Sequence, residues 1–429
     1  MNTRRTFLKQ LATTAAGTVL TPYFANSAQR ASAGISGVPV QGQMEVDWNE
    51  VRNHFHLKAG LNNLNNGVSP SLREALEKVH SGYEFCSEYP MENTPNYSLN
   101  SAQVADQLAS LLGCSKDELA LTHSTSEGLY TIIHGLDFSP GDEIIVSDRE
   151  YDTAFEALDI RQSRHGVVIK TAKLPLPTDD DDAIVASIER EITPKTKLIV
   201  ISHMEFRFGQ ILPVRKISEL AHSNNIDVLV DGAHGFAHVD FKLSDLGCDY
   251  YAAPTHKWLC GPLGAGFLYI ASQKIEKVWP HYATRNLGLN LKSIKKFRSF
   301  YTYGFVAQVA SIPALDFHKK LGPKVREERL RFLRNYWAQR VSSLRNLKIL
   351  TSLNTNQSCG IAAFRIDGVD SEALQKYLAE KHSIAVGSHD DPAISGLMQV
   401  RVAPNIYTST SELDAFVDIV TEVSKRGIP

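Results

Sequence analysis

The chain has 429 residues, a length that exceeds one compact core and favours two domains. It is 43% hydrophobic and 21% charged, as ordinary globular proteins are, and its net charge of −2 argues against a nucleic-acid-binding protein. No apolar run beyond the N-terminus is long enough to span a membrane, so we expect no membrane span in the mature chain.

The N-terminal segment has the pattern of an export signal. "TRRTFLK", with Arg4 and Arg5, precedes a weakly apolar stretch and then small residues that suit cleavage. It closely resembles the twin-arginine signal, which directs folded proteins across a membrane. We therefore expect a signal peptide over residues 1–33, an N-terminal arm over 34–65, the twin-arginine export machinery as a partner, and a periplasmic or other extracytoplasmic location.

Residues 66–300 are expected to form a large α/β domain. Short apolar runs alternate with helical patterns, and runs that are apolar on both faces and joined by helices indicate a mainly parallel sheet. Ligands of such sheets bind beyond the carboxyl ends of the strands. The expected strands are "DELALT", "EIIVS", "GVVIKTA", "KLIVIS", "IDVLVD", "DYYAAP" and "GAGFLYI".

Residues 301–429 are expected to form a smaller α+β domain. A long helical region, Val306–Leu344, leads into the strand-like segments "CGIAAFRI", "SIAVGS" and "LMQVRVAP", and helices are expected at Ser371–Lys381 and Ser411–Lys425. A cleft between two such domains is a natural place for a small-molecule site.

Ser124, Thr125 and Ser126 in "LTHSTSEGLYTIIHGL" lie between an expected strand and an amphipathic helix. Free amides and hydroxyls at a helix N-terminus bind a phosphate dianion well. The alternative is that these side chains merely cap the helix.

Asp231 ends the apolar strand of "IDVLVDGAHGFAHVDF", and His234 follows three residues later. A carboxylate in this place could keep a pyridine nitrogen protonated, or it could cap the following turn. A zinc site at His234 and His238 is a weaker alternative, because Gly235 disfavours the helix that would align them. No metal site is expected.

Lys257 stands alone in "PTHKWLCGPLGAG", before three glycines and a proline. Glycine is used where the backbone approaches something closely or takes positive φ. Lys257 could be an ordinary surface lysine, but burial could lower its pKa enough for imine formation. The chain order of phosphate cup, carboxylate and lysine favours the second interpretation.

From about Leu61 onward the sequence resembles the class V aminotransferase family, which consists of pyridoxal-phosphate enzymes of fold type I. The family includes cysteine desulfurases and isopenicillin N epimerase-like proteins, and "DGAH" with "THKWLCGPLGAG" carries the likeness. The resemblance implies pyridoxal 5′-phosphate as the cofactor and an internal aldimine at Lys257. It further implies that Asp231 pairs with the pyridine nitrogen and that His234 lies near the phenolic oxygen.

The same resemblance assigns the remaining contacts of the cofactor and the substrate. Thr125, Ser126 and His256 would hold the phosphate, and Tyr151 in "DREYDTA" would stack on the cofactor ring. Substrate binding falls to two residues: Arg401 in "QVRVAPNIYTSTSELDAF", which would hold a carboxylate, and Asn66.

Two segments depart from the family pattern. Phe305 follows Gly304 where the family usually has a threonine that reaches the phosphate of the partner subunit, and Phe206, beside Arg207, replaces a small or polar residue. The departures predict an unusual substrate side of the pocket, within an expected homodimer.

The resulting hypothesis is an exported enzyme that acts at the α-carbon of an amino acid or amine, as an aminotransferase or an epimerase does. Its alternatives are an elimination of the lyase or desulfurase kind, a catalytically inactive periplasmic binding protein, and a zinc hydrolase. "SIAVGSHDDPAISGLMQVR" contains no cysteine, and Cys359 and Cys260 lie in segments expected to be rigid. We therefore expect no persulfide-forming desulfurase activity.

Overall fold

The computed structural model describes residues 46–282, 290–298, 304–390 and 398–429. The expected signal peptide and the first part of the expected arm lie outside these residues. Residues 46–429 cluster as one unit, in which a large lobe and a small lobe are built on separate sheets. Within the described ranges, none of the helices combines the length and the apolar character needed to cross a membrane.

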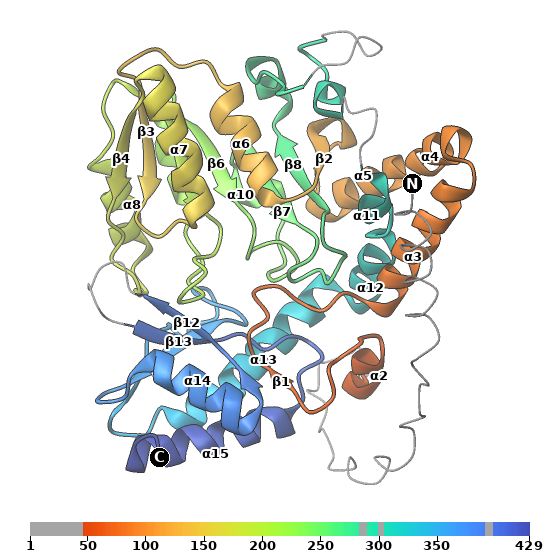
Figure 1. The fold of residues 1–429 in the computed structure, drawn as a ribbon. Helices are drawn as coiled ribbons and strands as arrows, with labels where there is room; N and C mark the ends of the chain where they lie inside the picture. Colours follow the sequence, from red (N-terminus) through yellow and green to blue (C-terminus); the bar gives the residue numbers. More distant parts are fainter. Residues whose placement is uncertain (1–45, 283–289, 299–303, 391–397) are drawn as a thin grey trace, which may run out of the picture. The chain divides into compact units, whose positions relative to one another are not determined.

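A seven-stranded sheet with the order β2-β8-β7-β6-β5-β3-β4 forms the large lobe (Figure 1). Six of the strands lie within the apolar segments that the sequence predicts, and β5 begins one residue before its segment. β8 alone runs in the direction opposite to the other six strands of this sheet, because the connection from β7 contains no helix to carry the chain back to the other end of the sheet. The strands are β2 (Leu119–Thr122), β3 (Glu143–Ser147), β4 (Val168–Ala172), β5 (Thr196–Ser202), β6 (Asp227–Asp231), β7 (Tyr250–Pro254) and β8 (Gly266–Ile270).

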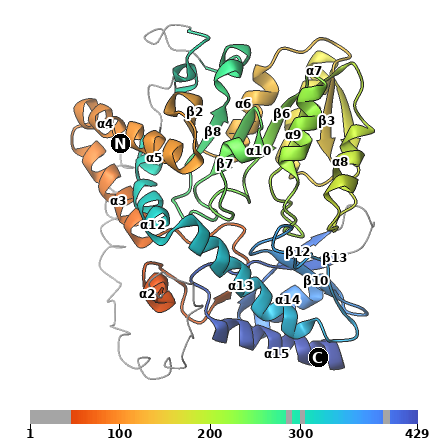
Figure 2. The ribbon, with the colours of Figure 1, turned by 180° about the vertical axis from the view of Figure 1, so that it is seen from behind.

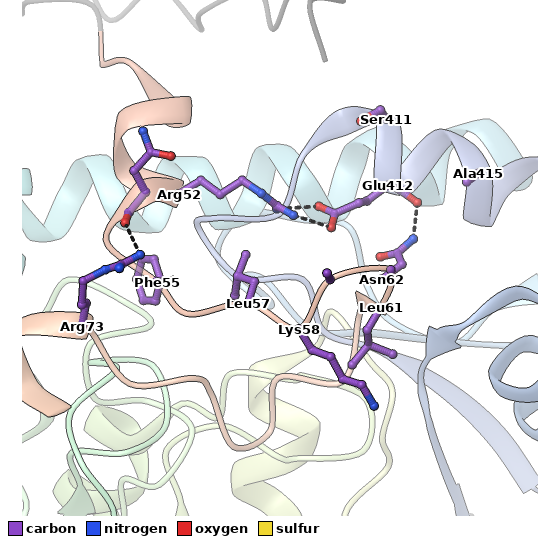
Figure 3. A pocket seen from close by; sticks show the side chains of 13 residues that line it. Arg52, Phe55, Leu57, Lys58, Leu61, Asn62, Arg73, Ser411, Glu412 and Ala415 are labelled. Carbon is purple, nitrogen blue, oxygen red and sulfur yellow. Dashed lines mark hydrogen bonds and ion pairs between the residues drawn. The ribbon is translucent and has the colours of Figure 1, made fainter. Parts of the chain in front are cut away.

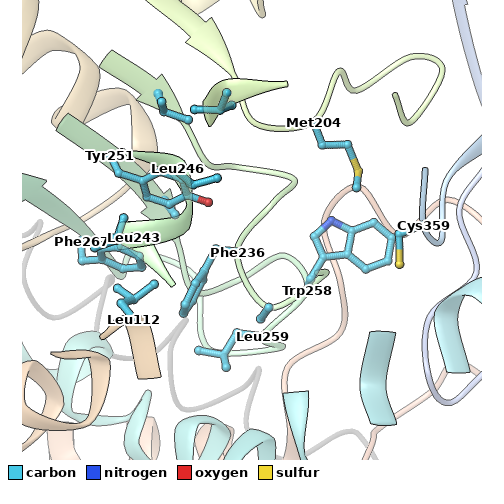
Figure 4. Packing of buried hydrophobic residues seen from close by; sticks show 14 of the residues in the cluster. Leu112, Met204, Phe236, Leu243, Leu246, Tyr251, Trp258, Leu259, Phe267 and Cys359 are labelled. Atoms are coloured by element: carbon cyan, nitrogen blue, oxygen red, sulfur yellow. The ribbon is translucent and has the colours of Figure 1, made fainter. Parts of the chain in front are cut away.

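Helices cover both faces of this sheet, with α6 and α7 in front in Figure 1 and α9 in front in Figure 2. Successive strand residues therefore enter different cores: Leu198 packs with α6 and α7, whereas Ile199 packs on the opposite side. Figure 4 shows part of the second core, which includes Trp258. The helices are α6 (Thr125–Gly135), α7 (Asp152–His165), α8 (Asp181–Glu189), α9 (Val214–Ser223) and α10 (Leu243–Leu246), and the short turns are η1 (Lys116–Glu118), η2 (Ser272–Lys277) and η3 (Ile294–Arg298).

One end of the large lobe is covered by helices from two distant parts of the chain. α11 and α12 pack against α3 and α5, although they lie beyond residue 300. The apolar contacts of α13 then pass from the large-lobe core at Leu330 to the small-lobe core at Leu333. These helices are α3 (Arg73–Glu88), α4 (Pro90–Ser98), α5 (Ser101–Leu112), α11 (Phe305–Val309), α12 (Ile312–Leu321) and α13 (Pro323–Val341).

The small lobe is an antiparallel sheet of order β12-β13-β10-β9 packed against helices. Its core contains a cluster of three aromatic rings, Trp337, Phe364 and Phe416. The N-terminal segment joins this lobe, because β1 (Asn62–Asn63) pairs with β11 (Ile384–Ala385). The other elements are α2 (Trp48–Asn53), β9 (Leu347–Ile349), β10 (Ala362–Ile366), α14 (Ser371–His382), β12 (Gly387–Asp390), β13 (Met398–Val402) and α15 (Thr410–Arg426).

Candidate active site

A cavity of about 470 Å³ lies at the carboxyl ends of the parallel strands. The large lobe lines most of it, and the small lobe contributes His389 and Arg401. The cavity brings together these residues predicted from the sequence: Thr125, Ser126, Tyr151, Asp231, His234, His256, Lys257 and Arg401.

Lys257 lies in the loop between β7 and β8, and its amine Nζ is 3.1 Å from Nε2 of His234. Burial of the amine, assisted by the nearby Arg401, lowers the pKa of Lys257 to about 8, while Asp231 acts in the opposite direction. About a tenth of the amine is therefore uncharged and nucleophilic at pH 7, far more than for a lysine with an ordinary pKa. This is the property that the sequence hypothesis required of Lys257.

The glycines after Lys257 serve the loop itself. A Cβ at Gly261 would lie 2.9 Å from the Thr255 side chain, so that position requires glycine for the loop to close. Gly264, at φ +83°, has the left-handed backbone that favours glycine. These glycines therefore lie close to other protein atoms, and they allow the backbone shape of the loop that contains Lys257.

Asp231 caps the turn after β6 and also lies on the wall of the cavity. Its Oδ1 accepts a 2.8 Å hydrogen bond from the amide of Ala233, as a capping residue does, yet the side chain also lines the cavity. Burial raises the pKa of Asp231, and the opposing effect of Lys257 lowers it. A cationic group placed in the cavity would likewise favour the carboxylate.

At the N-terminus of α6, one residue caps the helix and the next two face the cavity. Ser124 caps the helix by accepting a 3.2 Å hydrogen bond from the amide of Glu127. This leaves Thr125 and Ser126 on the cavity wall, where Thr125 Oγ1 is buried and has no partner in the described structure. His256 Nδ1 is likewise buried and unpaired within the described residues. These orphaned groups, one at the N-terminus of α6 and one in the loop after β7, line the same cavity and fit an oxyanion such as a phosphate.

Arg401 is a buried cation that faces the cavity. It donates from one NH group to Asn65 Oδ1 at 2.8 Å and from the other to the carbonyl of Phe206 at 3.2 Å. A Cβ at Gly67 would come within 2.7 Å of the guanidinium, so glycine leaves room for it there. Burial lowers the pKa of Arg401 to about 10, which still leaves it charged at neutral pH. It has no acidic ion-pair partner among the described residues, a state that suits an anionic ligand.

Asn66, which the resemblance assigned to the substrate, does not line the cavity in this structure. Asn66 is fully buried, donates a 2.8 Å hydrogen bond to the carbonyl of Ala403 and accepts one from the hydroxyl of Tyr407. Asn65 lines the cavity instead, because neighbouring residues of an extended segment point to opposite sides.

An aromatic wall, defined here as Tyr151, Phe206 and His389, stands beside Arg401. The ring of Phe206 lies edge to face with Tyr151 at 5.4 Å and with His389 at 5.5 Å. The guanidinium of Arg207 lies 4.1 Å from the centre of the Phe206 ring. Burial lowers the pKa of His389 to about 3, so its imidazole is uncharged. The sequence signalled Phe206 and Tyr151, but nothing pointed to His389.

Glu150 is a buried carboxyl group that sequence reasoning missed. It accepts hydrogen bonds from the hydroxyls of Ser147 and Ser202 and, at 3.0 Å, from the amide of Ser202. Burial raises the pKa of Glu150 to about 7. These bonds tie the loop that carries Tyr151 to the end of β5.

The geometry at His238 weighs against the zinc hypothesis. Its Nε2 accepts a 2.7 Å hydrogen bond from the amide of Gly360, and its Nδ1 lies 2.9 Å from the carbonyl of His234. With both ring nitrogens engaged by the backbone, no nitrogen lone pair of His238 is free for a metal ion. No metal-binding cluster of acids, histidines and cysteines occurs within the described ranges.

A second hollow, of about 720 Å³, lies between the N-terminal segment and α15 (Figure 3). Arg52 forms a bidentate ion pair with Glu412 there, and Asn62 donates to the carbonyl of Glu412. The polar groups drawn together in Figure 3 thus join the N-terminal segment to the small lobe. Since this hollow gathers no nucleophile with its base, the cavity at Lys257 is the candidate active site.

Comparisons with known proteins agree with this geometry. The family model for aminotransferase class V matches residues 63–416. Isopenicillin N epimerase of Streptomyces clavuligerus is 28% identical over 87% of this chain and 97% of its own length. A probable cysteine desulfurase of Mycolicibacterium paratuberculosis is 24% identical over 76% of this chain and 49% of its own length.

Two solved structures share the fold. The cystine C-S lyase C-DES, in complex with its reaction product cysteine persulfide, superimposes with a TM-score of 0.76 at 23% identity, covering 85% of this chain and 98% of that one. A mutant of C-DES with glycine covalently linked to its PLP cofactor gives a TM-score of 0.78 at 22% identity, covering 86% and 99%.

The fold and the site thus define a pyridoxal-phosphate enzyme of fold type I, which confirms the fold class predicted from the sequence. The chain belongs to the aminotransferase class V family. Members of that family use pyridoxal phosphate, and the predicted cofactor is confirmed on this basis.

Proposed function

We propose that the protein acts at the α-carbon of an amino acid or amine, as an epimerase or an aminotransferase does. The observation that carries the proposal is that the Lys257 amine, the Asp231 carboxyl group and the Arg401 guanidinium line one cavity, and that Arg401 has no acidic partner among the described residues. When bound, the cofactor supplies a pyridine ring that withdraws electrons from the substrate α-carbon. The 28% identity to an isopenicillin N epimerase supports chemistry that moves a proton at this atom.

Each residue of the cavity has a proposed role that follows from its chemistry. Asp231 would pair with the ring nitrogen, while Thr125, Ser126 and His256 would hold the phosphate. Lys257 would attach the cofactor and, once released, move the α-proton, because its pKa of about 8 suits both the uncharged and the charged form. Each of these groups already lines the cavity in the described structure.

The chemistry of the cavity wall favours substrates with an uncharged side chain. Lys257 and Arg401 are the cations among the lining residues at neutral pH, since burial lowers the pKa of His256 to about 4 and that of His389 to about 3. Once the cofactor takes Lys257 and a carboxylate takes Arg401, no lining cation remains for an acidic side chain. The aromatic wall would instead contact an apolar group.

A screen of amino acids against the cofactor-loaded protein tests the proposal. Uncharged substrates, above all apolar ones, should change the cofactor spectrum at lower concentrations than aspartate or glutamate. Chiral analysis, keto-acid assay and ammonia release then separate epimerisation, transamination and elimination. A protein whose spectrum responds to no amino acid or amine would support the alternative of an inactive binding protein.

Replacement of Arg401 by alanine should raise the KM for carboxylate substrates about 100-fold, the cost of losing a bidentate charge-assisted contact. Cofactor content should stay unchanged. The KM of Arg401→Lys should lie between those of the wild type and Arg401→Ala, because lysine keeps the positive charge but cannot form the bidentate contact. Steady-state kinetics with measured cofactor occupancy provide the test. If Arg207→Ala raises KM and Arg401→Ala does not, the carboxylate binds at Arg207.

The alternative of elimination remains, because desulfurases are among the relatives and a C-S lyase shares the fold. A persulfide-forming desulfurase needs a mobile thiolate. Cys260 and Cys359 are fully buried, burial raises the pKa of Cys359 to about 11, and neither lines the cavity. Sustained sulfide and alanine production from cysteine, lost on mutation of either residue, would contradict our exclusion of that chemistry.

We also propose that the protein is exported by the twin-arginine pathway and that it forms a homodimer. Arg4 and Arg5, which carry the export signal, lie outside the described residues. Gly304 and Phe305, where the family usually contacts the partner subunit, lie at the start of α11. Replacement of both arginines by lysines should trap the precursor in the cytoplasm, because the pathway requires the pair. Cell fractionation and the molecular mass in solution are the measurements. A mature, exported double mutant would refute the signal, and a monomer would refute the dimer.

A further inference from the structure

We propose that Trp258 sets the tautomer of His234 and thereby keeps the Lys257 amine ready in its uncharged form. The argument starts from the indole Nε1 of Trp258, which lies 3.3 Å from Nδ1 of His234 and donates to it. An indole nitrogen is only a donor, so Nδ1 of His234 must present its lone pair. The proposal deepens the role of Lys257 proposed above, and it makes Trp258 a positioning residue.

The proton of the neutral imidazole must then reside on Nε2. Burial lowers the pKa of His234 well below its ordinary value, and Lys257, Arg401, His238 and His389 act in the same direction. Nε2–H lies 3.1 Å from Nζ of Lys257 and can donate only to a lone pair. Among the forms of the amine, only the uncharged one has a lone pair.

A protonated amine would bring two donors face to face in this arrangement. The other groups around the amine act in both directions: Arg401 lowers the pKa of Lys257 and Asp231 raises it, while the adjacent His256 is neutral because its own pKa is lowered to about 4. The Trp258–His234 contact adds to the effect of burial. With this contact, the uncharged Lys257 amine is available to bind the cofactor at a lower pH than it would be without the contact.

Trp258 is packed within the buried apolar cluster, where Figure 4 shows its ring beside Met204 and Cys359. The indole is fully buried and stacks on the ring of His238 at 3.6 Å. His238 is itself fixed by the amide of Gly360, and Arg326 donates to the backbone carbonyl of Trp258. A ring held in this way can impose one tautomer on its neighbour.

The substitution Trp258→Phe tests the proposal, because it removes the N–H and keeps an aromatic ring against His238. Nδ1 of His234 could then take the proton, and Nε2 would accept from a charged Lys257. The pH midpoint for labelling of Lys257 should rise by about one unit, as one new charge-assisted hydrogen bond predicts. The measurement is labelling of the cofactor-free full chain with trinitrobenzenesulfonate across pH, read by peptide mass spectrometry.

Trp337→Phe is the matched control. Trp337 is another fully buried indole, and its Nε1 has no partner among the residues that the structure describes. It should therefore leave the midpoint unchanged. A folded Trp258→Phe variant whose midpoint equals that of the wild type overturns the proposal. Labelling involves no cofactor or substrate, so a shifted midpoint in a protein that never attaches the cofactor would refute the proposed function and leave this inference standing.

A second measurement does not depend on any variant being stable. Nitrogen-15 NMR of the cofactor-free wild type, with His234 assigned by its replacement, reports which ring nitrogen carries the proton. We expect the Nε2–H tautomer with an acceptor-type Nδ1. A proton on Nδ1 would overturn the proposal directly.

Discussion

Replacement of Lys257 by alanine is expected to lower turnover by more than about 10⁴-fold, because the variant loses both the attachment point of the cofactor and the group that moves the α-proton. The cavity keeps its phosphate-binding groups, so the cofactor should still bind noncovalently. Turnover assays and mass spectrometry after borohydride reduction, which fixes the cofactor on its lysine, are the measurements.

Lys296 offers a matched control. It is also buried, burial also lowers its pKa to about 8, and it donates to the backbone carbonyls of Ile275 and Leu291. It does not line the cavity, so Lys296→Ala should retain the covalent cofactor and most of the turnover. Reduction that labels Lys296, or any lysine other than Lys257, would overturn the assignment. Comparing the Lys257 and Lys296 variants shows whether loss of turnover requires a lysine in the cavity, since both lysines have a lowered pKa and only Lys257 lines the cavity.

Replacement of Asp231 by asparagine should lower the rate by about 100- to 1,000-fold, the usual cost of removing a preorganised electrostatic partner of a reacting centre. An amide is nearly isosteric and keeps an oxygen for the amide of Ala233, so the turn after β6 should persist. What it loses is the negative charge that holds a pyridine nitrogen protonated. The tests are kcat and the cofactor spectrum, with circular dichroism for the fold.

Asp249→Asn controls for the loss of a buried charge. Asp249 is buried, accepts a 2.8 Å hydrogen bond from the amide of Val228 and pairs with Lys274, but it lies outside the cavity. We expect Asp249→Asn to lower stability more than kcat and Asp231→Asn to do the reverse. A rate within a few-fold of the wild type for Asp231→Asn would leave Asp231 as a capping residue only.

The strands and the chain order of the site residues were predictable because their signals are local. Apolar runs such as Glu143–Ser147 reflect burial on both faces, and Asp231 ends one strand while Lys257 follows three residues after the end of another, each in an identifiable sequence context. The separation of Ser124 from Thr125 and Ser126 needed the structure, since all three hydroxyls lie at the start of the same helix and only the backbone direction decides which one caps it.

The sequence by itself thus determined the α/β fold, the family and eight of the residues that line the cavity, because these depend on periodicity and on motifs within short segments. Only the tertiary structure decided that Asn65 faces the cavity and Asn66 does not, that His389 joins the aromatic wall, and that Trp258 bonds to His234. The physical reason is that side-chain direction, burial and the resulting pKa depend on contacts between segments far apart in the chain. Arg401 and Asn65, 336 positions apart, meet only when the fold is complete.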